Sequence, residues 1–144
     1  MLTLLASAAR TASGNSGSLL DKLPHPEMIK RFRAVLDVTD AATEVDDTLD
    51  VYLQTTYDGV NWDDVLHFTQ VLGNGGAKTY IAEWDRDMAP ESEMHAPQDA
   101  VIAAGVVQGG KLGYDMRVKW VQVDAGGGAD SFTFSVGMDA VRER

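Results

Sequence analysis

The chain has no cysteine, only four prolines and few basic residues. The missing cysteines exclude disulfide bonds and thiolate metal sites. No stretch approaches the roughly 20 apolar residues that a membrane-spanning helix needs, so we expect no contact with a membrane. With 12 lysines and arginines against 22 acidic residues, the net charge is −10. A basic surface is what binds a phosphate backbone, so we also expect no nucleic-acid partner.

The residues of catalytic chemistry are also sparse. There are three histidines, His25, His67 and His95, and they lie between two prolines, in a predicted strand and in a long loop. A zinc site or a histidine-activated nucleophile needs several ligands or partners close together, and the spacing does not indicate any. We therefore assign no catalytic residue, no metal ligand and no cofactor, and we expect a protein that is not an enzyme.

The acidic segments have two interpretations. The sequence DGVNWDD at residues 58–64 has the oxygen side chains of a calcium loop, but it lacks the D-x-D-x-D-G order and the distant glutamate. We interpret it as a turn, because Asp58-Gly59 is a strong turn signal. The acidic residues at 44–47 and 85–93 are typical of solvated loops. The irregular stretch at 85–98 is long for a compact domain, and such loops are usually functional or mobile.

Alternation of apolar and polar residues dominates the rest of the chain, which favours half-buried strands. It is clearest at residues 49–56, and at residues 31–38 Val35 is the exception on the polar face. Residues 99–107 fit either a helix or a strand, and their flanking glycines favour a strand. A phase change near Trp120 indicates a bulge. The predicted strands cover residues 3–11, 31–38, 49–56, 64–72, 78–84, 99–107, 114–123 and 131–138.

This pattern predicts an all-β fold, an antiparallel sandwich or jelly-roll-like barrel of about eight strands. A chain of 144 residues is most simply one domain. We place that domain at residues 19–144, after an extended N-terminal arm at residues 1–18. The start, MLTLLASAAR, lacks the positive region of a signal peptide, and we interpret it as an arm or a first strand.

Three aromatic residues lie close together in the sequence, Tyr52, Tyr57 and Trp62. Tyr52 lies on the polar face of its strand, so the three side chains could form an exposed patch that stacks on a sugar. The other interpretation is that Trp62, next to a turn, covers the end of the sandwich. The sequence leaves both open.

Several stretches resemble the small β-rich structural proteins of tailed bacteriophages. These stretches are TLLASAARTASGNSG, FRAVLDVTDAA, TLDVYLQTTYDGVNWDDVLHF, LGYDMRVKWVQVD and SFTFSVGMDA. Within that group the chain is most similar to capsid decoration, or cement, proteins with a jelly-roll-like domain. The resemblance covers most of the chain, but not the loop at 85–98 or residues 99–107.

The resemblance implies a homotrimer on the outer surface of the virion capsid, with the major capsid protein and its own copies as partners. It implies no catalysis. The expected contacts lie in the arm and in the proline loop, at Leu2, Leu4, Leu5, Arg10, Leu23, Pro24 and Pro26. Two alternatives stay open. One is a tail or head–tail joining protein, and the other is a carbohydrate-binding module that uses the aromatic patch.

Overall fold

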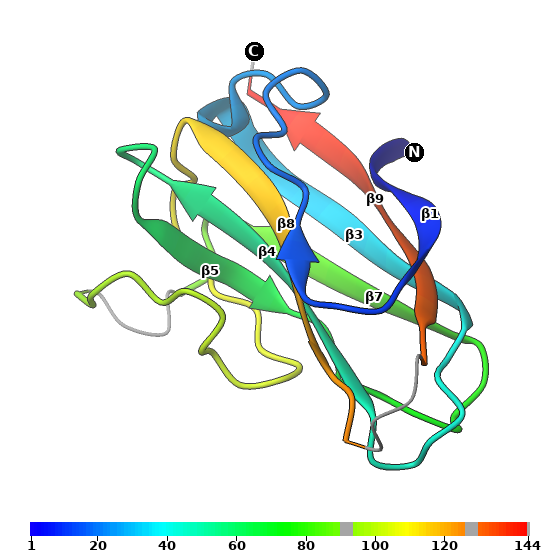
Figure 1. Cartoon of the computed structure of the whole chain (residues 1–144). Helices are drawn as coiled ribbons and strands as arrows, with labels where there is room; N and C mark the ends of the chain where they lie inside the picture. Colours follow the sequence, from blue (N-terminus) through cyan, green and yellow to red (C-terminus); the bar gives the residue numbers. More distant parts are fainter. Residues whose placement is uncertain (90–93, 126–129, 144) are drawn as a thin grey trace.

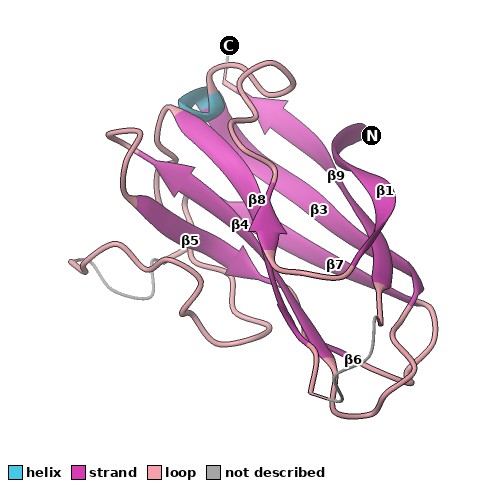
Figure 2. Ribbon diagram, viewed as in Figure 1, coloured by secondary structure: helices cyan, strands magenta, loops and turns pink. Residues whose placement is uncertain are grey.

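A computed structural model describes residues 1–89, 94–125 and 130–143, and in these ranges the chain is all β, with one short 3-10 turn at Pro26–Met28 (Figure 2). This confirms the predicted fold class. The strands are β1 (Leu2–Arg10), β2 (Gly14–Asn15), β3 (Ile29–Asp40), β4 (Thr48–Thr56), β5 (Trp62–His67), β6 (Val71–Leu72), β7 (Lys78–Asp85), β8 (Asp115–Val123) and β9 (Phe132–Arg142). In the described ranges no helix is long and apolar enough to cross a bilayer.

The strands form two antiparallel sheets that pack face to face (Figure 1). One sheet has four strands in the order β1-β9-β3-β7, and the other has five, in the order β2-β8-β4-β5 with β6 beside β4. If β6 is set aside, the first strand pairs with the last and the second with the last but one. The pairs β3–β7 and β4–β5 complete the series. The chain is therefore one long hairpin rolled around a core, which is a jelly roll.

The core lies between the sheets and follows from the alternation. From the four-stranded sheet, β3 contributes Phe32, Ala34, Leu36 and Val38, as predicted, and β9 contributes every second residue from Phe132 to Met138. Phe32 stacks on Trp84 of β7 with ring centroids 5.0 Å apart. The five-stranded sheet supplies Leu49, Val51, Leu53, Met116, Val118 and Trp120. Burying one such large side chain contributes about 1.5–3 kcal/mol, so this layer holds the two sheets together.

The N-terminal segment is part of the sandwich. The sequence predicts an arm at residues 1–18, but β1 is hydrogen-bonded to β9 and β2 to β8. Leu4 is 1% exposed, in the core. Arg10 fixes the end of β1, since its guanidinium lies over the rings of Trp120 and Phe134 and donates to the Phe134 carbonyl at 2.9 Å. Detaching this strand would expose apolar surface and break a hydrogen-bond ladder, which is why it stays in the sheet.

Three other predictions need comment. The strand predicted at residues 99–107 is wrong, because this segment is a loop that contributes one isolated bridge, Val107 to Leu66. The bulge predicted near Trp120 is also wrong, since β8 pairs with β4 without a break in register. The turns predicted at Asp58-Gly59 and at residues 73–76 are confirmed, with Gly59 at φ 80° and Asn74 at φ 61°.

Candidate functional site

The outer face of the five-stranded sheet is partly covered by the chain itself. Residues 98–108, here called the covering loop, run along β5 and over its outer side. Backbone hydrogen bonds join the loop to the strand, from Asp64 to Gln98 at 2.8 Å, from His67 to Val106 at 3.0 Å and from Gln108 to Val65 at 2.8 Å. Three outward-facing residues of β4, Tyr52, Gln54 and Thr56, are buried although the sequence pattern of this face is polar, while Thr48 and Asp50 are partly exposed.

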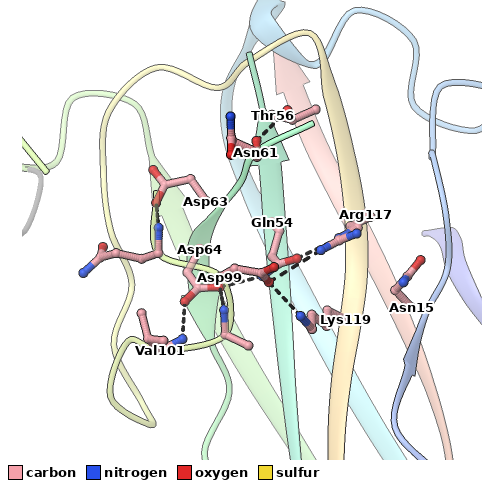
Figure 3. A network of polar contacts seen from close by, with 12 residues as sticks. Asn15, Gln54, Thr56, Asn61, Asp63, Asp64, Asp99, Val101, Arg117 and Lys119 are labelled. Carbon is pink, nitrogen blue, oxygen red and sulfur yellow. Dashed lines mark hydrogen bonds and ion pairs between the residues drawn. The ribbon is translucent and has the colours of Figure 1, made fainter. Parts of the chain in front are cut away.

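The carboxylate of Asp64 anchors this loop (Figure 3). It is 1% exposed. One oxygen, Oδ1, accepts from Gln54 Nε2 and from the Ala100 backbone N–H, each at 2.9 Å. The other, Oδ2, accepts from the backbone N–H groups of Val101 at 2.8 Å and Ile102 at 3.1 Å. A buried carboxylate whose two oxygens each accept two hydrogen bonds stabilises a conformation, so this arrangement is structural.

Two histidine–aspartate pairs lie near the covering loop. His67 is buried, and its two nitrogens face the Ile102 carbonyl and Asp50 Oδ1, each at 2.8 Å. Burial alone would lower the pKa of His67, but these hydrogen bonds and the charge of Asp50 raise it overall. His95 lies 2.8 Å from Asp63. Both ring nitrogens of His67 are thus occupied by Ile102 and Asp50, so neither nitrogen faces a nucleophile as the base of a catalytic triad does.

The prediction of an exposed aromatic patch is wrong for Tyr52, one of its three residues. Tyr52 is 5% exposed and stacks on His67 with centroids 4.0 Å apart, and burial with the nearby carboxylates raises its pKa to about 12. The covering loop causes this burial. Tyr57 is 63% exposed, while Trp62 is partly buried, with Arg117 at 4.4 Å over its ring. The cation already occupies one face of the indole that a sugar would need.

The predicted contact residues divide into two groups. Leu4, Leu23 and Pro26 are buried in the chain, so the prediction that they touch a partner is wrong for the folded protein. Leu2 and Pro24 are exposed, and Leu5 and Arg10 are partly exposed. For these four, contact with a partner stays a prediction.

In the turn at residues 58–64, the carboxylate of Asp58 accepts hydrogen bonds from other residues of the same turn. Asp58 Oδ1 accepts from the backbone N–H groups of Val60 at 2.8 Å and Asn61 at 2.7 Å, and Oδ2 accepts from the Asn61 side chain at 2.7 Å. These bonds, first that from Asn61, hold the pKa of Asp58 well below its usual value. Interpretation as a turn is therefore supported over a calcium loop.

The outer face of the four-stranded sheet, in contrast, is open. We call this surface the open face. It is formed by the alternate residues of three adjacent strands that point away from the core. They are Arg31, Arg33, Val35 and Asp37 of β3, Thr79, Ile81, Glu83 and Asp85 of β7, and Ser135, Gly137, Asp139 and Val141 of β9.

The open face has an apolar row beside a charged one. In the apolar row, Val35 lies between Gly137 and Ile81 in the strand register, Ile81 is 62% exposed, and Met1 packs over Gly137. In the charged row, Arg33 lies between Asp139 and Glu83 and donates to Glu83. Shallow grooves of about 700 Å³ and about 440 Å³ lie along these rows.

The sequence did not predict the apolar row of the open face, although the sequence contains one signal of it. Val35 is the apolar residue that interrupts the polar face of its predicted strand, and a lone exposed apolar residue needs no explanation. Only the pairing of β3 with β7 and β9 shows that Val35 has apolar neighbours on both sides.

Comparison of the chain with models of protein families, with curated proteins and with solved structures found no match. The site must therefore be judged from its own geometry. An open sheet face with shallow grooves, an apolar row and a row of paired charges is suited to binding another macromolecule.

Proposed function

We propose that this chain is a structural protein of a tailed-bacteriophage virion, a decoration protein that binds the outer surface of the head as a trimer and stabilises the shell. Two observations support a role of this kind. The first is the resemblance of five sequence stretches to small phage structural proteins. The second is the jelly-roll topology, which viral capsid domains use. Lectins use it too, so the fold alone does not select the function.

The observation that carries the proposal is the asymmetry between the two outer faces. The chain covers one of them with its own loop and leaves the other open, with Ile81 62% exposed in an apolar row. A decoration protein is held by many modest contacts that symmetry repeats over a lattice, and it has no need of a deep pocket. A shallow, mixed apolar and charged face fits that requirement.

The charged row gives such a face a preferred orientation on its partner. Arg33 is flanked by Glu83 on β7 and Asp139 on β9, so opposite charges alternate across three strands. Complementary charges contribute more to specificity and to the association rate than to affinity. The apolar row would then supply the affinity, and the charged row would fix the orientation of this face on its partner.

The test is the variant Ile81→Asp, with Val60→Asp as its matched control. Val60 is 78% exposed in the turn between β4 and β5, away from the open face. We expect the wild type and Val60→Asp to be trimers in multi-angle light scattering and to co-sediment with expanded phage heads that lack a decoration protein. Ile81→Asp should lose at least one of these properties while its thermal unfolding stays close to that of the wild type.

A wild-type chain that is monomeric and has no affinity for heads would refute the proposal. Binding that survives in Ile81→Asp would refute the role of the open face alone. Quantifying the chain in purified virions distinguishes the alternatives within the phage class, because a head–tail joining or tail-tip protein is present in few copies. The carbohydrate-binding alternative is weakened by the burial of Tyr52.

A further inference from the structure

Two connections between the sheets lie side by side at one end of the sandwich. β3 pairs with β9, and β4 pairs with β8. The end of β3 therefore lies beside the start of β9, and the start of β4 lies beside the end of β8, at the end of the sandwich opposite the β4–β5 turn (Figure 1). Residues far apart in the sequence meet there.

Four acidic side chains converge at this end. Glu44 and Asp47 come from the first connection, and Asp124 and Asp130 from the second. Each offers one carboxylate oxygen, and these four atoms all lie within 4.8 Å of one another. At such distances the charges of four carboxylates repel one another. By itself such a cluster does not indicate a ligand.

A second and independent feature is the environment of Asp47. Its side chain is 1% exposed. Its Oδ1 accepts from the Ala125 backbone N–H at 2.9 Å, and its own backbone is bonded to Glu44 and Gly73. Its Oδ2 is buried and has no hydrogen-bond partner among the residues that the structure describes. A buried carboxylate oxygen costs free energy unless a donor, a water or an ion satisfies it.

Asp130 repeats this feature in the opposite connection. Its Oδ1 accepts from Thr43 Oγ1 at 3.4 Å, while its Oδ2 is buried and has no hydrogen-bond partner within the described part of the chain. Two connections therefore each contribute a carboxylate oxygen to the same small space, and each of these carboxylates keeps one oxygen unsatisfied. A shared cation would satisfy both of them and remove the repulsion.

We propose that Glu44, Asp47, Asp124 and Asp130 bind one calcium ion. Calcium prefers hard oxygen ligands at about 2.3–2.6 Å, so ligands on opposite sides of the ion are about 4.6–5.2 Å apart, and four oxygen atoms that all lie within 4.8 Å of one another fit around such an ion. Magnesium binds its ligands at about 2.0–2.1 Å in a strict octahedron and usually takes only one or two carboxylates, whereas four carboxylates converge here. The ion would join the two connections and close this end of the sandwich.

The experiment uses the full chain after treatment with a chelator, titrated with calcium chloride in a calorimeter. We expect one ion per chain with a dissociation constant below about 1 mM, and a thermal midpoint that rises with calcium concentration. Asp47→Asn keeps the size of the side chain and the bond from Ala125, and should weaken calcium binding at least about tenfold. Asp46→Asn, at the neighbouring acidic residue outside the cluster, should bind calcium as the wild type does.

If Asp47→Asn fails to fold, Glu44→Gln is the second variant, and the same loss of at least about tenfold is expected. The proposal is overturned if the wild type shows no binding up to about 10 mM calcium, or if both cluster variants bind as well as the wild type. Magnesium that binds as tightly as calcium would overturn the assignment to calcium.

Discussion

The anchoring of the covering loop by Asp64 leads to a prediction of measurable size. In Asp64→Asn, one of the two carboxylate oxygens becomes an NH2 group that faces donors instead of accepting from them. Each oxygen accepts two hydrogen bonds, so either orientation of the amide breaks two. A buried donor left without its acceptor costs about 1–3 kcal/mol, which gives a loss of about 2–6 kcal/mol out of a typical total of 5–15 kcal/mol.

Two measurements check this expectation. Unfolding in urea, followed by tryptophan fluorescence, should give a free energy lower by at least about 2 kcal/mol. Amide exchange should show where the loss arises, because the N–H groups of Ala100, Val101 and Ile102 donate to Asp64. A local opening that becomes about 2 kcal/mol easier accelerates their exchange about thirtyfold.

The matched control is Asp63→Asn, in the adjacent residue. The side chain of Asp63 is 19% exposed, its Oδ2 faces His95 Nε2 at 2.8 Å, and its Oδ1 accepts one backbone hydrogen bond, from Gln98 at 2.9 Å. An asparagine oxygen can keep that bond, so the loss should stay below about 1.5 kcal/mol. The reasoning is refuted if Asp64→Asn unfolds at the wild-type urea concentration, or if it is destabilised while the three amides exchange at wild-type rates.

Three further predictions concern other parts of the sandwich. The pKa of His67 is raised by Asp50, so this pair stabilises the fold below the pKa of an unfolded histidine, about 6.5. Its contribution is lost as the pH rises through the folded pKa. In urea unfolding, the difference in the free energy of unfolding between the wild type and His67→Gln should therefore shrink as the pH is raised to about 9. Gly113→Ala should be destabilised by more than about 2 kcal/mol, because the new Cβ would lie 2.0 Å from the Thr56 carbonyl oxygen; thermal unfolding measures this. Arg10→Ala should lose about 2 kcal/mol in the same assay, and Arg10→Lys should not restore it, since an ammonium group cannot reproduce the forked bonds of a guanidinium.

Alternation in the sequence predicted the strands wherever one face of a strand is buried and the other is exposed. Residues 31–38 and 131–138 satisfy that condition, and their buried residues are those expected. The prediction for Tyr52 is wrong because β4 is buried on both faces. A polar residue on the second face signals exposure only if nothing covers it, and the cover comes from residues 98–108, far along the chain.

The prediction of a strand at residues 99–107 is wrong for the same reason, because the structure of this segment depends on contacts with residues far away in the sequence. The segment's backbone groups bond to the side chain of Asp64 and to the edge of β5, which gives neither the period of a helix nor that of a strand. The acidic cluster is also non-local, because each connection alone has the composition of a solvated loop. Sequence spacing could not reveal it, since the pairing of β3 with β9 and of β4 with β8 brings the two connections together.

The edges of the two sheets differ in the same way as their outer faces. The edge of the five-stranded sheet at β5 is closed by backbone hydrogen bonds to the covering loop. The edge of the four-stranded sheet at β7 is not paired with any other strand of the described ranges, and an unpaired edge is where another chain can add. Ile81 belongs to this edge and also to the apolar row of the open face. The unpaired edge at β7 and the open face therefore both belong to the four-stranded sheet, and a partner that covered the open face would lie next to the unpaired edge. We expect an assembly built from this chain to place its contacts there, and to leave the covering loop facing solvent.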